Sequence, residues 1–94
     1  PPVTQDSEFH ALKGALAQQA GEYAMALESY EALVRHYPDN GGWLAGLGVS
    51  RDQTGDIPGA LDAYQQALRA GGLPPTVNQY VSQRLRQLSA PEGE

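Results

Sequence analysis

The side chains that could carry out catalysis or bind a metal are few in this sequence, and they form no known arrangement. His10 and His36 lie far apart in the chain, and there is no cysteine. Zinc sites usually show His-x3-His or His-Glu-x2-His spacing or several cysteines, and none of these occurs. The glycines do not form a Gly-x4-Gly-Lys-Ser/Thr phosphate loop, and no serine has a partner base arranged for catalysis. We therefore expect no enzymatic activity, no cofactor and no bound metal.

Charge and composition exclude two further classes of partner. The formal net charge is −5, and the six basic residues are scattered along the chain. Nucleic acids and anionic membrane surfaces both require clustered Lys and Arg, so we expect neither nucleic acid nor direct membrane contact. No apolar run reaches the roughly 18 residues that span a bilayer. Hydrophobic residues make up 40% of the chain, which is enough to form a core.

The sequence gives few signals about the compartment. It begins Pro1-Pro2 with neither a methionine nor a signal peptide, so we expect a piece of a longer protein. A membrane anchor or signal could then precede it. The lack of cysteine rules out disulfides but leaves both the cytoplasm and the periplasm open.

The strongest feature of the chain is an internal repeat. When residues 41–72 are shifted back by 34 positions, they match residues 7–38. The shift superimposes Gly48 on Gly14, Gly55 on Gly21, Ala60 on Ala26, and Tyr64 on Tyr30. Self-similarity at this period is typical of stacked helix–turn–helix units.

Helix signals divide the chain into five helices. Apolar residues recur at three- and four-residue steps, and the segments are separated by glycine or proline at Gly21, Pro38, Gly55 and Gly71. In this arrangement His36 lies in the last turn of a helix and His10 packs between helices. The predicted divisions are a linker at 1–5, a first hairpin at 6–40, a second hairpin at 41–73, a capping helix at 74–88, and a disordered tail at 89–94.

Packing within this arrangement depends on small residues and leaves one face open. We expect Gly48 to allow close approach of the next helix, with Ala60 as the facing small surface, and Gly14 to pair with Ala26 in the same way. The fifth helix should cover Tyr64. The outer face of the first hairpin, around Phe9, has no cover, so either more repeats precede it or two chains form a homodimer there.

These motifs resemble the tetratricopeptide repeat, whose pattern is Trp-x2-Leu-Gly-x2-Tyr, then Ala-x3-Phe, then Pro. The second unit matches at Leu47-Gly48 and at Ala60-x3-Tyr64, and the first matches at Gly14, at Ala26-x3-Tyr30 and at Pro38. Arg51 and Ala17 replace the tyrosine of the pattern. Trp43 is one position early, and Gly72 replaces the final proline. The resemblance implies an all-α fold, an α-α superhelix of two repeats with a capping helix. It also implies a non-enzymatic module that binds proteins.

In this family the first helix of each repeat lines a concave groove that holds a peptide or a helix. Ala11 and Ala15 stand where chaperone-binding members carry Lys and Asn, so we expect no role as a chaperone-tail receptor. The same surface could instead be only solvated, or covered by neighbouring repeats. Carried over by position, the groove residues are Glu8, Ala11, Ala15, Gln18, Gln19, Gly42, Ala45, Val49, Asp52, Gln53, Gln79, Gln83, Arg86 and Gln87.

A narrower resemblance concerns the runs 38–48, 67–73 and 80–85. They are similar to the C-terminal repeats of biogenesis proteins of the mannose-sensitive haemagglutinin type IV pilus. That resemblance implies a bacterial protein in pilus or secretion assembly, on the periplasmic side of the inner membrane; without it, a cytoplasmic location is expected. The alternative function is structural, as a terminal cap of a longer solenoid without a ligand of its own.

Overall fold

The computed structural model describes residues 5–90, which form five α-helices and no strand. This confirms the predicted all-α fold class. None of the helices in the described part is long and apolar enough to cross a bilayer. The helices are α1 (Gln5–Gln19), α2 (Tyr23–His36), α3 (Gly41–Gln53), α4 (Ile57–Ala70) and α5 (Pro75–Ser89).

The same backbone turn closes both hairpins. Gly21 and Gly55 have φ values of 77° and 92°, in the left-handed region that glycine adopts without strain. After α1, the amide of Glu22 donates to the carbonyl of Ala17 at 2.8 Å; after α3, the amide of Asp56 donates to the carbonyl of Arg51 at 2.9 Å. These bonds satisfy carbonyls at the helix end. The 34-residue shift therefore holds for the hydrogen bonds as well as for the sequence.

The helix starts and stops lie within one or two residues of their predicted positions. Asn40 caps α3, because its Oδ1 accepts from the amide of Trp43 at 3.0 Å, and Asp56 caps α4 by accepting from the amide of Gly59 at 3.0 Å. Gln5, predicted in the linker, belongs to α1, and Ser89, predicted in the tail, ends α5. The rest of the predicted linker, 1–4, and residues 91–94 of the tail lie outside the described residues.

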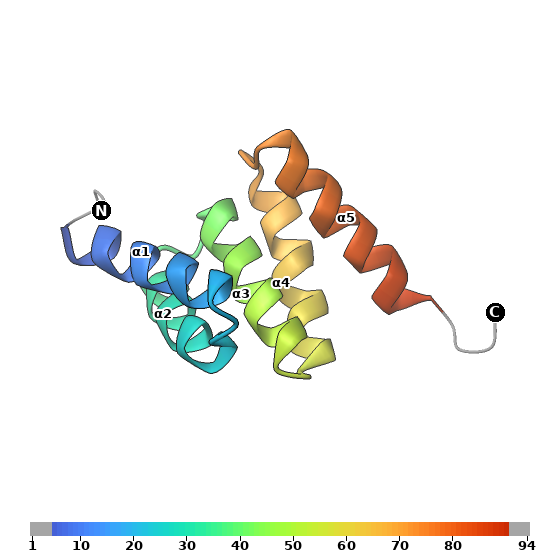
Figure 1. The fold of residues 1–94 in the computed structure, drawn as a ribbon. Coiled ribbons are helices and arrows are strands. Elements are labelled where there is room, and N and C mark those ends of the chain that lie inside the picture. The colour runs from blue at the N-terminus through green and yellow to red at the C-terminus, as the bar shows by residue number, and fades with distance from the viewer. Residues whose placement is uncertain (1–4, 91–94) are drawn as a thin grey trace.

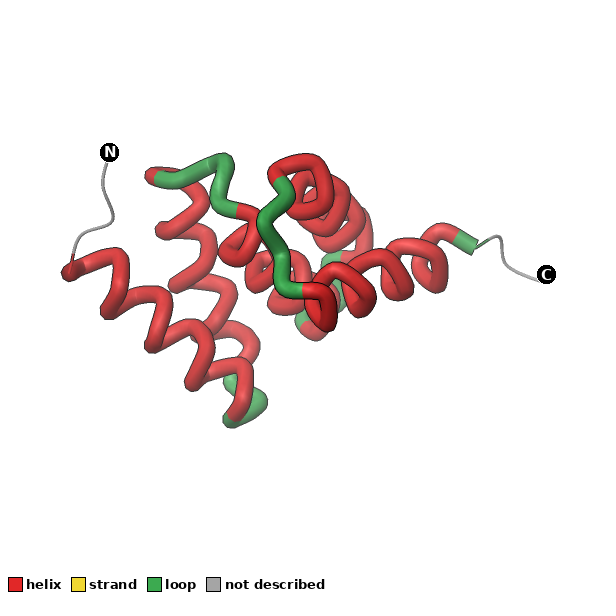
Figure 2. The backbone as a smooth tube through the Cα atoms, turned by 90° about the horizontal axis from the view of Figure 1, so that it is seen from above, coloured by secondary structure: helices red, strands yellow, loops and turns green. Residues whose placement is uncertain are grey.

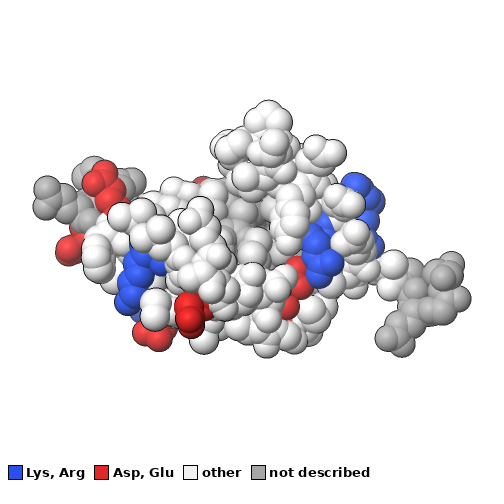
Figure 3. Space-filling model, viewed as in Figure 1, with Lys and Arg blue, Asp and Glu red and all other residues white. Residues whose placement is uncertain are grey.

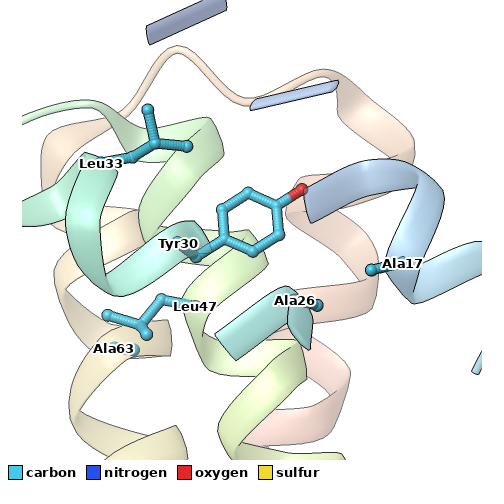
Figure 4. Packing of buried hydrophobic residues seen from close by; sticks show 6 residues of the cluster. All are labelled: Ala17, Ala26, Tyr30, Leu33, Leu47 and Ala63. Carbon is cyan, nitrogen blue, oxygen red and sulfur yellow. The ribbon is translucent and has the colours of Figure 1, made fainter. Parts of the chain in front are cut away.

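Two buried tyrosines organise the core. Tyr30 lies in a first cluster with residues of α1, α2, α3 and α4, and Tyr64 lies in a second cluster with residues of α3, α4 and α5. Figure 4 shows Tyr30 among the apolar side chains of the first cluster, which are Ala17, Ala26, Leu33, Leu47 and Ala63. Tyr30 is 6% exposed and Tyr64 is fully buried.

Tyrosine rings are the nearest neighbours of Gly14 and Gly48. A Cβ added at Gly48 would lie 2.5 Å from the ring of Tyr64, and one added at Gly14 would lie 2.9 Å from the ring of Tyr30. The nearest atoms therefore belong to the tyrosine rings; Ala60 and Ala26 are fully buried in the same clusters, and their pairing with Gly48 and Gly14 stays a prediction. The glycines leave room for a flat ring, which needs more space than a methyl group would.

The helices stack side by side in chain order, as Figures 1 and 2 show. The second hairpin packs on α2, and α5 lies against α4 before running away from it toward the C-terminus. Val81 is completely buried in the cluster around Tyr64, so α5 does cover the second hairpin as predicted. Phe9 remains 62% exposed, which confirms that the outer face of the first hairpin is open in the described structure.

Candidate functional site

A shallow hollow lies between α3 and α5. Its volume is about 260 Å³. Figure 3 shows largely uncharged surface between these helices, with basic side chains further along α5. The lining residues from α3 are Gly42, Ala45, Gly46 and Val49, and those from α5 are Thr76, Val77, Tyr80 and Val81.

Small residues of α3 form one wall of this hollow. Ala45 is only 4% exposed, and Gly46 is buried because the ring of Tyr30 lies directly behind it. A guest segment on this wall would therefore lie close to the helix backbone. Glycines in helix interiors are costly, at roughly 0.8–1.0 kcal/mol relative to alanine, and here the close packing of Tyr30 offsets that cost.

The α5 wall consists of apolar side chains with one exposed aromatic ring. Val77 and Val81 point into the core cluster that contains Tyr64 and Leu44. Tyr80 remains 41% exposed although it is a large aromatic residue. An exposed ring beside an apolar hollow is the kind of side chain that anchors protein interfaces.

A polar cluster holds α5 in place beside the hollow. Arg84 forms a two-pronged contact with Asp52 of α3, with Nε donating to Oδ2 at 2.9 Å and Nη2 donating to Oδ1 at 2.8 Å. The hydroxyl of Tyr64 donates to the same Oδ2 at 3.0 Å. The hydrogen bond to Asp52 raises the pKa of Arg84, which stays charged. The cluster therefore joins α3, α4 and α5, and it already engages the carboxylate of Asp52, which we expected to contact a partner.

The two core tyrosines predict a loss of stability in alkali. Burial raises the pKa of Tyr30, and burial together with the hydrogen bond to Asp52 raises the pKa of Tyr64 above its ordinary value near 10. Above pH 10 the unfolded chain ionises these rings while the folded chain keeps them neutral. The free energy of unfolding should then fall by up to about 1.4 kcal/mol per pH unit for each tyrosine.

Urea unfolding followed by circular dichroism between pH 8 and pH 11 measures this effect. Stability should be flat up to about pH 9.5 and decline above it. The variant Tyr64→Phe should show a shallower decline, because one of the two shifted groups is gone. A wild-type decline that Tyr64→Phe leaves unchanged would contradict the assignment to Tyr64.

Gln18, another predicted groove residue, is engaged within the chain. Its Nε2 donates to the carbonyl of Gly46 at 2.8 Å and to Oγ of Ser50 at 3.1 Å. Ser50 in turn donates from Oγ to the carbonyl of Gly46 at 3.0 Å. These bonds join α1 to α3, so Gln18 contributes to the stacking of the two hairpins.

The remaining predicted groove residues divide into two groups. Gly42, Ala45 and Val49 line the hollow, as expected from their position on α3. The others do not line it: Glu8, Ala11, Ala15, Gln19, Gln53, Gln79, Gln83, Arg86 and Gln87. Their contacts with a partner stay predictions.

Position in the repeat predicts the same face for every odd-numbered helix, which explains the difference on α5. Helix α3 turns the edge with Ala45 and Val49 toward α5, but α5 turns the opposite edge, with Val77 and Tyr80, back toward α3. The apolar stripe of α5, which runs from Val77 through Val81 to Leu88, carries this information, because the edge beside a buried stripe must face the preceding helix.

The structure also brings the two histidines together, which sequence spacing did not indicate. His10 and His36 line one hollow of about 360 Å³ between α1 and α2, together with Asp6. Ser7 donates from Oγ to the hydroxyl of Tyr37 at 3.1 Å at its edge. Within residues 5–90, no group of three or more His, Cys, Asp or Glu side chains is arranged to hold a metal ion.

Comparison with known proteins adds one finding. A family model described as tetratricopeptide repeat matches residues 12–73. The match runs from the middle of α1 to the loop after α4, so it spans both hairpins and leaves α5 outside. No curated protein matches the chain, and the resemblance to pilus biogenesis proteins therefore stays a prediction.

Proposed function

Because the chain belongs to the tetratricopeptide repeat family, whose repeats generally mediate protein–protein interaction without catalysis, we propose that it docks a segment of another protein between α3 and α5. The observation that carries this proposal is the apolar hollow with the exposed Tyr80 ring at its edge. Hollows of this kind between helices accept an amphipathic helix or an extended peptide.

The chemistry of the hollow narrows the kind of segment it would accept. The α3 wall offers only small side chains and backbone, so apolar side chains of the guest can come close to it. Beyond the hollow, α5 presents the exposed side chains of Gln79, Gln83 and Arg86. These form a polar rim with a positive charge, which suits a guest with an apolar centre and a polar or acidic flank.

A binding measurement on matched variants tests this proposal. Peptides selected from a phage-displayed library on the purified chain are titrated by calorimetry. Val49→Glu places a charge in the hollow, and Tyr80→Ala removes the exposed ring. Both variants should weaken binding by at least about tenfold, which corresponds to about 1.4 kcal/mol.

The control variant is Gln65→Ala, which changes an exposed side chain of α4 outside the hollow. Its affinity should equal that of the wild type. Binding that survives both Val49→Glu and Tyr80→Ala, or that Gln65→Ala abolishes, would place the docking surface elsewhere.

The structural alternative is that the chain caps a longer solenoid. The observation in its favour is that α5 buries Val81 toward Tyr64 while its outward side chains Gln79, Gln83 and Arg86 are exposed, as in terminal repeats with a polar outer face. Truncation after Gly72 separates the two functions. A cap loses solubility and cooperative unfolding, whereas a docking module also loses half of its hollow and its peptide affinity.

The proposal also covers the cellular role and location of the protein. The similarity of 38–48, 67–73 and 80–85 to pilus biogenesis proteins supports a role in pilus or secretion assembly in the bacterial periplasm. Deleting the gene in its source organism and counting surface pili tests that role. We also propose that the open face of the first hairpin makes a second protein contact, either with neighbouring repeats or with a second copy of the chain.

A further inference from the structure

The open face of the first hairpin is a compact apolar surface. We define the α1 face by its exposed apolar side chains, which are Phe9 at 62%, Leu12 at 59%, Leu16 at 53% and Met25 at 45% exposure. They surround a hollow of about 380 Å³ that Lys13 and Glu22 also line. Patches of this kind on a folded domain usually mark an interaction site.

The repeat shows that the faces equivalent to the α1 face are buried elsewhere in the chain. The 34-residue shift places Lys13 on Leu47 of α3 and on Val81 of α5. Leu47 is 4% exposed and Val81 is fully buried, because a preceding hairpin covers each of them. The equivalent faces of α3 and α5 are therefore both covered within the molecule. On the α1 face, which is exposed, a lysine stands at the position where the other two faces bury an aliphatic side chain.

Lys13 sets a chemical requirement for any partner of the α1 face. A covered charge is costly unless it meets an opposite charge, so the partner must place a carboxylate opposite Lys13. The α1 face has such a group itself, because Glu22 lines the same hollow at the start of α2. Lys13 is also the one lysine of the sequence. The face thus contains apolar side chains and both members of a charge pair.

We propose that the α1 face is a two-fold interface between two copies of this chain. A two-fold axis through the middle of the hollow brings Lys13 of each copy to Glu22 of the other, so that each pair occurs twice. Leu12, Leu16 and Met25 are buried between the two pairs. A surface that complements itself in this way needs no second kind of protein.

A head-to-tail contact between copies does not meet the same requirement. The opposite end of the molecule is α5, and the sequence of α5 contains no Asp or Glu. It carries Arg86, whose positive charge would repel Lys13, whereas Arg84 is already paired with Asp52. The α1 face therefore pairs with itself rather than with α5.

The size of the α1 face predicts a weak dimer. Its four apolar side chains offer roughly half of the about 800 Å² per partner of a standard interface. We expect a dissociation constant in the micromolar range or above, and it should rise with salt because salt screens the attraction between Lys13 and Glu22.

Sedimentation equilibrium of the 94-residue chain at increasing concentration tests the dimer. The wild type should change from monomer to dimer. Lys13→Glu and Glu22→Lys should each weaken dimerisation by about tenfold, and the double variant Lys13→Glu/Glu22→Lys should return to within about threefold of the wild type. A contact between these two groups on different copies predicts this restoration, together with single variants that unfold in urea like the wild type when monomeric.

Two controls complete the experiment. Glu31→Lys makes the same charge change on an exposed residue outside the α1 face and should leave the dimer unchanged. Leu12→Ser should give monomers with the helical spectrum of the wild type. A wild type that stays monomeric at the highest concentration, or a double variant no better than the single ones, would overturn the proposal and point to a different occupant.

Peptide binding to the hollow between α3 and α5 is measured in the same variants. Neither Lys13 nor Glu22 lines that hollow, so a monomeric Lys13→Glu chain should bind peptide as the wild type does. Loss of the dimer and loss of peptide binding are therefore separate outcomes.

Discussion

Replacing Tyr64 with alanine is expected to lower the free energy of unfolding by about 3–5 kcal/mol, as for large aromatic residues in other cores. Tyr64 is fully buried, and its ring lies against Gly48. The substitution leaves a cavity between the second hairpin and α5, and it removes the hydroxyl that donates to Asp52. Small domains are stable by only about 5–15 kcal/mol, so much of the stability depends on this one ring.

Urea unfolding at neutral pH measures this loss, and two variants separate its causes. Tyr64→Phe keeps the ring and removes one hydrogen bond to a charged group, so a loss of about 1.5–3 kcal/mol is expected. Tyr80→Ala truncates a ring that is 41% exposed and should cost less than either. If Tyr64→Ala and Tyr80→Ala were equally stable, Tyr64 would not be the centre of the second core cluster.

Adding a single methyl group to α3 is expected to destabilise the fold, although alanine normally favours helices. A Cβ at Gly46 would lie 2.5 Å from the ring of Tyr30, and one at Gly48 would lie 2.5 Å from the ring of Tyr64. Real Cβ atoms do not approach that closely, so the rings and helices must move apart. Overpacking of this kind costs about 1–3 kcal/mol, and we expect this loss for both Gly46→Ala and Gly48→Ala in urea unfolding.

Gly42→Ala is the matched control on the same helix. Gly42 is exposed, and a Cβ there would meet only Oδ1 of Asn40 at an ordinary distance of 3.5 Å. The variant should therefore gain up to about 0.8–1.0 kcal/mol from helix propensity. We therefore predict that the change in the free energy of unfolding has opposite signs for Gly42→Ala and Gly48→Ala. A stabilising effect at Gly42, Gly46 and Gly48 alike would show that the tyrosine rings do not fill these spaces.

The sequence was sufficient to predict the helices and their order. Gly21 and Gly55 mark the two hairpin turns because their backbone needs positive φ, and the caps Asn40 and Asp56 mark the starts that follow. These are local signals, which depend on a few neighbouring residues. The repeat then predicted the stacking, because two units with equal patterns bury equal faces.

The contacts between helices could not be predicted in the same way. The ring of Tyr64 faces Gly48, and Arg84 reaches Asp52 across 32 positions of sequence. Such pairs depend on how the helices turn about their axes, which spacing along one helix does not determine. Tyr80 of α5 was missed for another reason: its position in the repeat predicted the wrong edge of the helix, whereas the apolar stripe of α5 indicates the right one.

The central claim is that a partner segment lies between α3 and α5, and chemical-shift mapping tests it most directly. Backbone amide resonances of the labelled chain are followed while a selected peptide is added. We predict the largest changes at Ala45, Val49 and Tyr80, which line the hollow, with α2 nearly unchanged. Changes concentrated on α2, or spread evenly over all five helices, would contradict the account.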